Sequence, residues 1–362
     1  MNFKGNLAYI LIGTFMFLAI YLVLASIPIG PDLHFDPVWT VALDSLPETG
    51  LSADSAPVIP AGDDIEPFIL GARFGYFSPS GAIPMNVRTE ERVSISPAGW
   101  SVYEDAAVMS DIRFRDGSGR MKIDAEGYPY LVGANVYLFP PGGDSVSLYG
   151  RSGARVWTRE HSAPITAFSS SPAGTVIGYA DGHLAVMDDA REVFSFYPGG
   201  SDLQVVLGAA ISRDGSLIGC VSGIDRQRFL LIQAREGKHK ILHHVYLDDN
   251  LRRRVYVAFE SSGRFAFFET ANGLGVVDSE KNESWIIPVP GSVVATGECL
   301  EDTLFIVLSR DGEEFVLSAI ERPNHVVASE RFPGTDAFLT QRGSSLFLGI
   351  DGTISRIDVR GL

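Results

Sequence analysis

One pattern of short strands recurs seven times along this chain of 362 residues. In each copy an apolar run enters a tight turn and leaves it as a second apolar run, as in FGYFSPSGAIPM around Gly81. Successive turn centres are 39 to 48 residues apart, at Gly81, Gly127, Gly174, Gly215, Gly263, Asp302 and Gly343. Glycine suits these turns because positive φ angles cost it no Cβ clash. Such a repeat limits the fold to an array of similar small units.

The later copies show what one unit contains. After Asn272-Gly273 the chain continues with the apolar run LGVV, a polar turn at 279–282 and the run SWIIPV. Each unit therefore has four short strands joined by Asp-Gly or Asn-Gly turns. Strand-only units with a period of about 40–50 residues are typical of a β-propeller. We predict an all-β propeller of seven four-stranded blades, with six or eight as alternatives.

The two ends of the repeated region indicate how the ring closes. After Asp351-Gly352 the last copy reads TISRIDVRGL, one strand short of a blade. The apolar segment Ile65–Leu70 precedes the first copy and is predicted to complete that blade, which would prevent an unpaired sheet edge. The region 88–120 fits the count least well, because the hairpin Val93–Trp100 follows the first turn by only 18 residues.

The N-terminal region contains an uncharged apolar stretch, Leu7–Ile29. About 20 apolar residues span a bilayer as a helix, whereas the apolar core of a signal peptide usually has about 7–15. Lys4 precedes the stretch and the next Lys or Arg is Arg73, so the positive-inside rule places the N-terminus in the cytoplasm. We predict a short cytoplasmic segment at 1–6 and a transmembrane signal-anchor helix at 7–29. A signal peptide cleaved near Ala25 is the alternative.

Residues 30–64 carry repeated proline and acidic residues, which is typical of an extended tether. Its piece Pro37–Leu43 is apolar enough to dock on the folded domain, so a structured clamp and a loose spacer are both open. The propeller is expected at 65–362. The predicted location is the cytoplasmic membrane, with one span and an extracytoplasmic, periplasmic C-terminal domain.

The net charge of the domain limits the classes of partner that it is expected to bind. The formal net charge is −15, and an acidic surface repels phosphate backbones, so we expect no nucleic acid partner. The stretch from Asp225 to Arg254 differs, with eight basic and four acidic residues. It is either a solvated outer strand with its turn or a docking patch for an acidic partner or an anionic envelope polymer. Arg252, Arg253 and Arg254 fall between units, where loops reach a face of the disc, and are the candidate partner-binding residues.

Signals for catalysis are sparse. The chain has no nucleophile elbow, zinc-binding His-Glu-x-x-His motif, phosphate loop or calcium loop. His243 and His244 are adjacent, and strand alternation would point their rings to opposite faces. Cys220 and Cys299 each lie in an apolar run and are expected to be buried in neighbouring units, although a disulfide is conceivable in an oxidising compartment. We predict no catalytic, cofactor-binding or metal-binding residues.

The stretch from Gly153 to Trp157 and the sequence GYADGHLAVMD at 178–188 resemble a pyrroloquinoline-quinone-type propeller repeat. WD40 domains are similar in period, but their Gly-His and Trp-Asp pairs are missing. The resemblance implies an exported propeller of the broad PQQ-like/WD40-like class. Quinone-dependent dehydrogenases of this class use a vicinal cysteine pair, whereas Cys220 and Cys299 are 79 residues apart. The outer-membrane-assembly scaffold, a non-enzymatic lipoprotein, is the closer analogy, although this chain lacks a lipid-attachment cysteine.

Three function classes remain. The first is a membrane-anchored scaffold that binds other envelope proteins, and the missing catalytic signals favour it. The second is a ligand-binding or sensor domain, which the very short predicted cytoplasmic segment disfavours as a transmembrane signalling device. The third is an exported enzyme, which would need polar residues from several blades to converge on the central channel.

Overall fold

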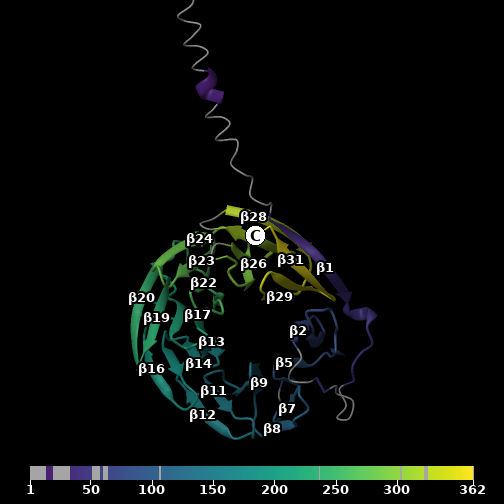
Figure 1. The fold of residues 1–362 in the computed structure, drawn as a ribbon. Helices are drawn as coiled ribbons and strands as arrows, with labels where there is room; N and C mark the ends of the chain where they lie inside the picture. Colours follow the sequence, from purple (N-terminus) through teal and green to yellow (C-terminus); the bar gives the residue numbers. More distant parts are fainter. Residues whose placement is uncertain are drawn as a thin grey trace, which may run out of the picture.

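Eight antiparallel β-sheets stand around a common axis and close into a ring (Figure 1). The computed structural model of the chain describes residues 14–18, 33–50, 58–59, 64–105, 107–235, 237–301, 304–321 and 325–361. Within these ranges, seven sheets have four strands and one has three. The first strand of each blade lies nearest the axis, and the later strands follow outward.

The first four blades follow one another along the chain. Blade 1 consists of β2 (Glu66–Leu70), β3 (Arg73–Phe77) and β4 (Met85–Arg88). Blade 2 consists of β5 (Arg92–Ser96), β6 (Gly99–Tyr103), β7 (Ser110–Phe114) and β8 (Arg120–Ile123). Blade 3 consists of β9 (Tyr128–Val132), β10 (Asn135–Phe139), β11 (Ser145–Tyr149) and β12 (Arg155–Glu160). Blade 4 consists of β13 (Ile165–Ser171), β14 (Gly174–Tyr179), β15 (Leu184–Met187) and β16 (Glu192–Phe196).

The last four blades include the one that joins both ends of the domain. Blade 5 consists of β17 (Val206–Ile211), β18 (Leu217–Ser222), β19 (Arg228–Arg235) and β20 (Lys238–Tyr246). Blade 6 consists of β21 (Val257–Phe259), β22 (Phe265–Thr270), β23 (Gly273–Asp278) and β24 (Glu283–Ile287). Blade 7 consists of β25 (Ser292–Thr296), β26 (Leu304–Asp311), β27 (Glu314–Glu321) and β28 (His325–Pro333). Blade 8 consists of β29 (Ala337–Arg342), β30 (Ser345–Ile350), β31 (Thr353–Arg360) and β1 (His34–Ala42), and the short 3-10 helix η1 (Leu43–Ser45) follows β1.

The predicted count of seven blades is wrong by one. The missed blade is blade 2, in the region that fitted the repeat least well. From Gly174 onward the repeated turns join the first and second strands of their blades, but Gly81 follows the second strand of blade 1 and Gly127 precedes blade 3. Because blade 1 has three strands, Glu66–Ile123 contains two blades in little more than one period. The shifted turns therefore concealed one unit.

Closure uses a different strand from the predicted one. Segment 65–70 contributes β2, which pairs with β3 of blade 1, whereas β1 pairs with β31 from His34↔Arg360 to Ala42↔Thr353. Of the two alternatives left open for Pro37–Leu43, the structure shows the structured clamp, which is the closing strand. The pairing shifts register between Pro37 and Trp39, and a bulge of this kind accommodates a proline that cannot donate to the ladder.

The predicted transmembrane helix at 7–29 is wrong. Within the part of the chain that the structure describes, no helix is long and apolar enough to cross a membrane. The described helical residues in that range are 14–18, and five residues rise about 7 Å against a hydrocarbon core of about 30 Å. The other residues of 7–29, and the segment 1–6, lie outside the described residues. The single-pass membrane location depended on this helix and is wrong with it.

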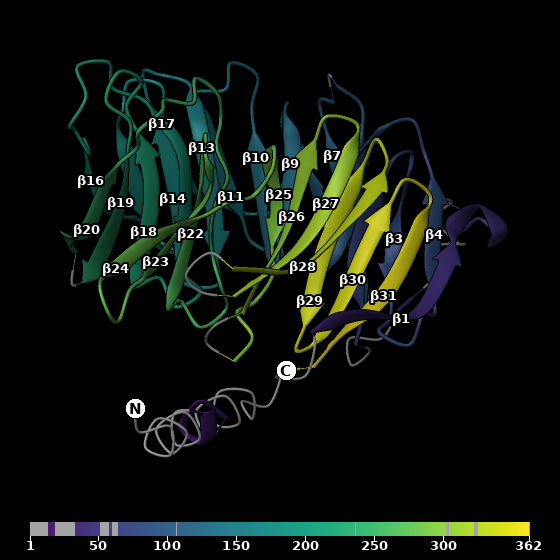
Figure 2. The same cartoon turned by 90° about the horizontal axis from the view of Figure 1, so that it is seen from above.

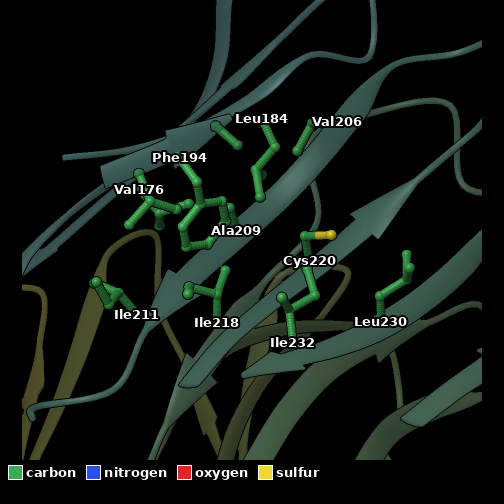
Figure 3. Packing of buried hydrophobic residues seen from close by; sticks show 12 residues of the cluster. Val176, Leu184, Phe194, Val206, Ala209, Ile211, Ile218, Cys220, Leu230 and Ile232 are labelled. Atoms are coloured by element: carbon green, nitrogen blue, oxygen red, sulfur yellow. The ribbon is translucent and has the colours of Figure 1, made fainter. Parts of the chain in front are cut away.

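The core is a series of apolar layers between neighbouring blades. Between blades 4 and 5, Val176 and Leu184 pack with Val206, Ile218 and Cys220 (Figure 3). Strands such as β14, β17 and β22 are buried at every residue. They lack the alternation of apolar and polar residues found in one-sided sheets, because the next blade covers each face.

The disc has two loop-bearing faces (Figure 2). In the four-stranded blades, the connecting face carries the turns between second and third strands and the loops that lead to the next blade, and the opposite face carries the turns between first and second strands and between third and fourth strands. Blade 1 runs in the reverse direction: Glu66 at the start of β2 meets Arg342 on the opposite face, and Gly71 in the β2–β3 turn meets Asp336 on the connecting face. Since β31 runs from the connecting face to the opposite face and His34 pairs with Arg360, the domain begins and ends on the opposite face.

Candidate functional site

The three predicted partner-binding arginines lie together on the connecting face, in the loop between β20 and β21, but they differ in their contacts. All three are exposed. Among the described residues, Arg252 and Arg254 make no ion pair through their guanidinium groups, whereas Arg253 is bound to Glu269. Two of the three are therefore available to a partner.

Arg253 neutralises a buried carboxylate. Its Nη2 lies 2.7 Å from Oε1 of Glu269 and its Nη1 lies 3.0 Å from Oε2. Glu269 is only 2 % exposed and also accepts hydrogen bonds from the backbone N–H groups of Tyr256 and Val293. These contacts tie the loop to blades 6 and 7. The hydrogen bonds from Arg253 to Glu269 raise the pKa of the guanidinium.

The basic stretch does not form one patch. Arg226 and Arg252–Arg254 lie in loops of the connecting face, whereas Arg235 and Lys238 lie at the other end of the β19–β20 hairpin, where they pair with each other in register. A strand of eight residues separates the two groups by about 23 Å. The basic residues in the middle of the stretch from Asp225 to Arg254 therefore lie away from those on the connecting face.

A small cavity near the axis lies beside Arg254. Its volume is about 210 Å³, and it is lined by residues of two first strands, β9 and β13, together with Phe139, Gly143 and Arg254. The lining residues from the first strands are Tyr128, Tyr130, Ile165, Thr166, Ala167 and Phe168. Aromatic rings and one guanidinium thus dominate the wall.

The rings around this cavity pack in defined geometries. Tyr128 stacks on Phe139 with centroids 5.0 Å apart, and Phe168 meets both Phe139 and Tyr130 edge-on at 5.0 and 5.8 Å. Tyr128 and Tyr130 are nevertheless 46 % and 43 % exposed. Burial raises the pKa of the Tyr128 hydroxyl, and Arg254 opposes this shift. The phenol therefore stays protonated at neutral pH, so it is a hydrogen-bond donor and not a general base.

A second set of aromatic and arginine side chains lies farther out on the connecting face. Arg226 stands over the ring of Tyr246 at 5.0 Å and Arg228 at 5.8 Å. Tyr197 and Leu203 are exposed in the neighbouring loop region between blades 4 and 5. We call Tyr197, Leu203, Arg226 and Tyr246 the rim set. Together with the cavity beside Arg254, it makes blades 3 to 6 the aromatic-rich sector of this face.

The opposite face holds a larger, acidic cavity of about 640 Å³. Asp214, Glu260, Glu280 and Glu298 line it together with Arg264. Two of these carboxylates already serve the turns, because Glu298 accepts hydrogen bonds from the backbone N–H and hydroxyl of Ser261, and Glu260 accepts one from the backbone N–H of Phe265. In the described residues, no three His, Cys, Asp or Glu side chains gather as metal ligands.

The two cysteines are not joined by a disulfide, and they lie in blade 5 and blade 7, which are not neighbours. Cys220 is fully buried in β18, and this burial raises its pKa to about 12. Cys299 is half-buried and lines the acidic cavity, so it departs from the expected full burial. The thiol of Cys220 is inert at physiological pH because almost none of it is thiolate.

Between blades 3 and 4, two histidine rings stack at 4.6 Å on the connecting face. His161 shares a hydrogen bond of 2.8 Å between Nε2 and Oδ2 of Asp181, while Nδ1 of the buried His183 has no hydrogen-bond partner among the described residues. Burial and the charge of His161 lower the pKa of His183. The sequence does not predict this pair, because His161 and His183 are not adjacent and no motif at either position indicates that their rings stack.

The sequence did contain a signal for the cavity beside Arg254. Tyr128-Pro129-Tyr130 alternates two exposed tyrosines with a buried proline in a first strand. A strand next to the axis that exposes large aromatic side chains is a candidate binding surface. The repeat analysis uses this stretch only to locate a turn, so the binding surface was missed.

A closed ring of eight antiparallel blades in the described residues defines a β-propeller. A family model described as a beta-propeller protein matches residues 1–362, and the chain belongs to this family. This confirms the predicted class at the level of the propeller fold. The PQQ-like type of its repeats stays a prediction.

Similar proteins were found by sequence and by structure. A Treponema pallidum (strain Nichols) protein described as uncharacterized is 36 % identical over 368 residues, covering 100 % of this chain and 97 % of the relative. BamB from Moraxella catarrhalis has a TM-score of 0.60 at 12 % identity, covering 90 % of this chain and 100 % of BamB. Chaetomium thermophilum Sqt1, solved bound to the N-terminus of the ribosomal protein L10, has a TM-score of 0.54 at 11 % identity, covering 81 % of this chain and 92 % of Sqt1. At these identities the structural matches show the fold alone.

Proposed function

We propose that this protein is an interaction scaffold that binds a protein partner through the connecting face of blades 3 to 6, and that it is not an enzyme. The observation that carries the proposal is the gathering of exposed tyrosines and arginines in that sector. Tyr and Arg are enriched among the residues that dominate binding energy at protein interfaces. Binding through this face requires no membrane anchor.

The chemistry of the sector supports binding over catalysis. The cavity beside Arg254 offers aromatic rings, the protonated phenol of Tyr128 and a guanidinium, but among the described residues its lining includes no carboxylate, histidine or thiol to act as general base or nucleophile. Binding needs only the shape, the apolar area and the charge that these residues supply. The solved Sqt1 propeller, which holds a polypeptide end, supports the proposal by fold-level analogy only.

A small-ligand or sensor role is the second candidate, favoured by the acidic cavity on the opposite face. Its volume of about 640 Å³ falls in the range of small-molecule sites, and its carboxylates would suit a cationic ligand. It ranks second because the carboxylates of Glu260 and Glu298 are already hydrogen-bonded to the turns.

Site-specific photocrosslinking in the cells that naturally produce the protein tests the first candidate. A photoreactive phenylalanine replaces Tyr246 on the connecting face or, as the matched control, Arg213 in the exposed β17–β18 turn of the opposite face. We expect a discrete protein adduct from position 246 and none from position 213. Adducts from position 213 alone, or from neither position, would contradict binding through the connecting face.

A further inference from the structure

We propose that the cavity beside Arg254 receives one aromatic side chain of the partner polypeptide, with a neighbouring acidic residue of the same segment paired to Arg254. The inference rests on the proposed function and specifies the chemistry of the bound segment. It assigns Tyr128, Tyr130 and Phe168 to the aromatic side chain and Arg254 to the carboxylate.

The cavity is of a size that fits a single side chain. Sites for drug-sized molecules occupy about 300–1,000 Å³, whereas this cavity has about 210 Å³. A polypeptide crossing the connecting face could insert one residue and leave its backbone outside. A buried anchor residue in a fitted pocket is the usual centre of a protein interface.

The geometry of the wall selects an aromatic ring. Tyr128 and Phe139 are parallel to within 7°, whereas Phe168 meets Phe139 at 79° and Tyr130 at 82°. An inserted ring can therefore stack on one member of the wall and meet another by its edge. Both arrangements are favoured by the ring quadrupole, and each such contact adds about 0.5–1.5 kcal/mol beyond area burial.

The charge at the cavity selects an acidic neighbour. Arg254 is the charged residue in the lining, and among the described residues its guanidinium has no ion-pair partner. A planar guanidinium can bind a carboxylate through two parallel hydrogen bonds. A Lys or Arg of the partner would gain contact with the tyrosine rings but would be repelled by Arg254. The favoured segment is therefore aromatic and acidic, in keeping with the acidic partner considered for these arginines.

The test measures binding of dye-labelled synthetic peptides to the full chain by fluorescence anisotropy. The probe is acetyl-Gly-Asp-Phe-Glu-Gly-amide, and the comparison peptides replace Phe by Ala or both acids by their amides. We expect the probe to bind most tightly. Arg254→Gln should weaken the probe about fivefold, as expected for an exposed ion pair, and should leave the amide peptide unchanged. Tyr130→Ser should weaken both Phe-containing peptides about tenfold or more.

Two control variants test whether the loss of peptide binding is specific to the cavity. Arg213→Gln removes an exposed arginine from the β17–β18 turn of the opposite face, and Ile241→Ser removes an exposed apolar side chain from the outer strand β20; neither residue lines the cavity. Both should leave probe binding unchanged, and melting curves should show that all four variants remain folded.

Several results would overturn the inference. One is equal affinity for the Phe and Ala peptides, and another is equal weakening of probe binding by Arg213→Gln and Arg254→Gln. Absence of measurable binding would also reject the pocket. None of these results would remove the proposed function, because crosslinking at position 246 could still capture a partner held by the rim set alone.

Discussion

Arg252, Arg253 and Arg254 are consecutive in the sequence but have separate roles in the structure. Arg253 compensates a carboxylate that is almost completely buried, Arg254 lines the cavity near the axis, and Arg252 is exposed to solvent. A change at all three positions would therefore mix stability with binding. The two effects have to be separated residue by residue.

Replacing Arg253 by Gln should lower the free energy of unfolding by about 1–3 kcal/mol, because Glu269 would remain buried with an uncompensated charge. Arg252→Gln and Arg254→Gln should change it by less than about 0.5 kcal/mol, since neither guanidinium is ion-paired among the described residues. Urea unfolding of the three variants measures the difference. Equal stability of all three would show that the Arg253–Glu269 contact contributes nothing net.

The stacked histidines predict a dependence of stability on pH. Burial lowers the pKa of His183, next to His161, Arg159, Asp181 and Glu192. The unfolded chain therefore binds a proton at higher pH than the folded chain does. The contribution of His183 to stability is complete above about pH 6.5 and is lost as the pH falls toward its folded pKa.

We accordingly expect the melting temperature to fall between pH 7 and pH 5.5, and to fall less in His183→Gln. His325→Gln is the matched control, because His325 is exposed in the edge strand β28. An identical pH slope in wild type and His183→Gln would show that protonation of His183 is not coupled to unfolding.

At the level of strands and blades, the sequence predicted the architecture where the units are regular and failed where they are short. From Gly174 onward the turn glycines repeat at equivalent positions, so the four-strand unit was correct there. In the described residues blade 1 has three strands, and neither Gly81 nor Gly127 lies in a turn between first and second strands, so both are out of phase with the later turns. The cavity near the axis could not be predicted from the repeat pattern. Tyr128, Phe168 and Arg254 come from different parts of the sequence, and their proximity depends on how the blades pack around the axis.

The closing strand provides a test of ring closure. Val41→Pro should destabilise the domain by about 3 kcal/mol or more, because proline cannot donate to the ladder and Val41 pairs with Ile354. Val38→Pro is the control, since Val38 lies at the register shift and has no partner on β31. Circular dichroism melts of the two variants compare them. An equal decrease in melting temperature for the two variants would mean that the pairing of β1 contributes little to ring closure.

For the whole molecule, the negative net charge contrasts with the positive charge of one sector of the surface, and this contrast affects how a partner approaches. The chain carries −15, yet Arg226, Arg252 and Arg254 are exposed on the connecting face. Such a sector steers an acidic partner into place while the remainder of the surface repels it, and both effects are screened by salt.

Capture of the natural partner should therefore weaken as ionic strength rises, chiefly through slower association. In the double variant Arg252→Gln, Arg254→Gln the salt dependence should be shallower, with the melting temperature unchanged. Association rates at several salt concentrations give the two slopes. Parallel slopes for wild type and double variant would exclude these arginines from steering.

The pairing of β1 with β31 also has a mechanical consequence. His34 and Arg360 lie side by side at one end of an antiparallel pair, so a force that separates these two points loads the ladder from its end. The hydrogen bonds would then break one after another, as in a zipper, instead of sharing the load in shear. The ring should open at low force when pulled by its two ends. It should resist far more strongly when one handle is moved to the connecting face.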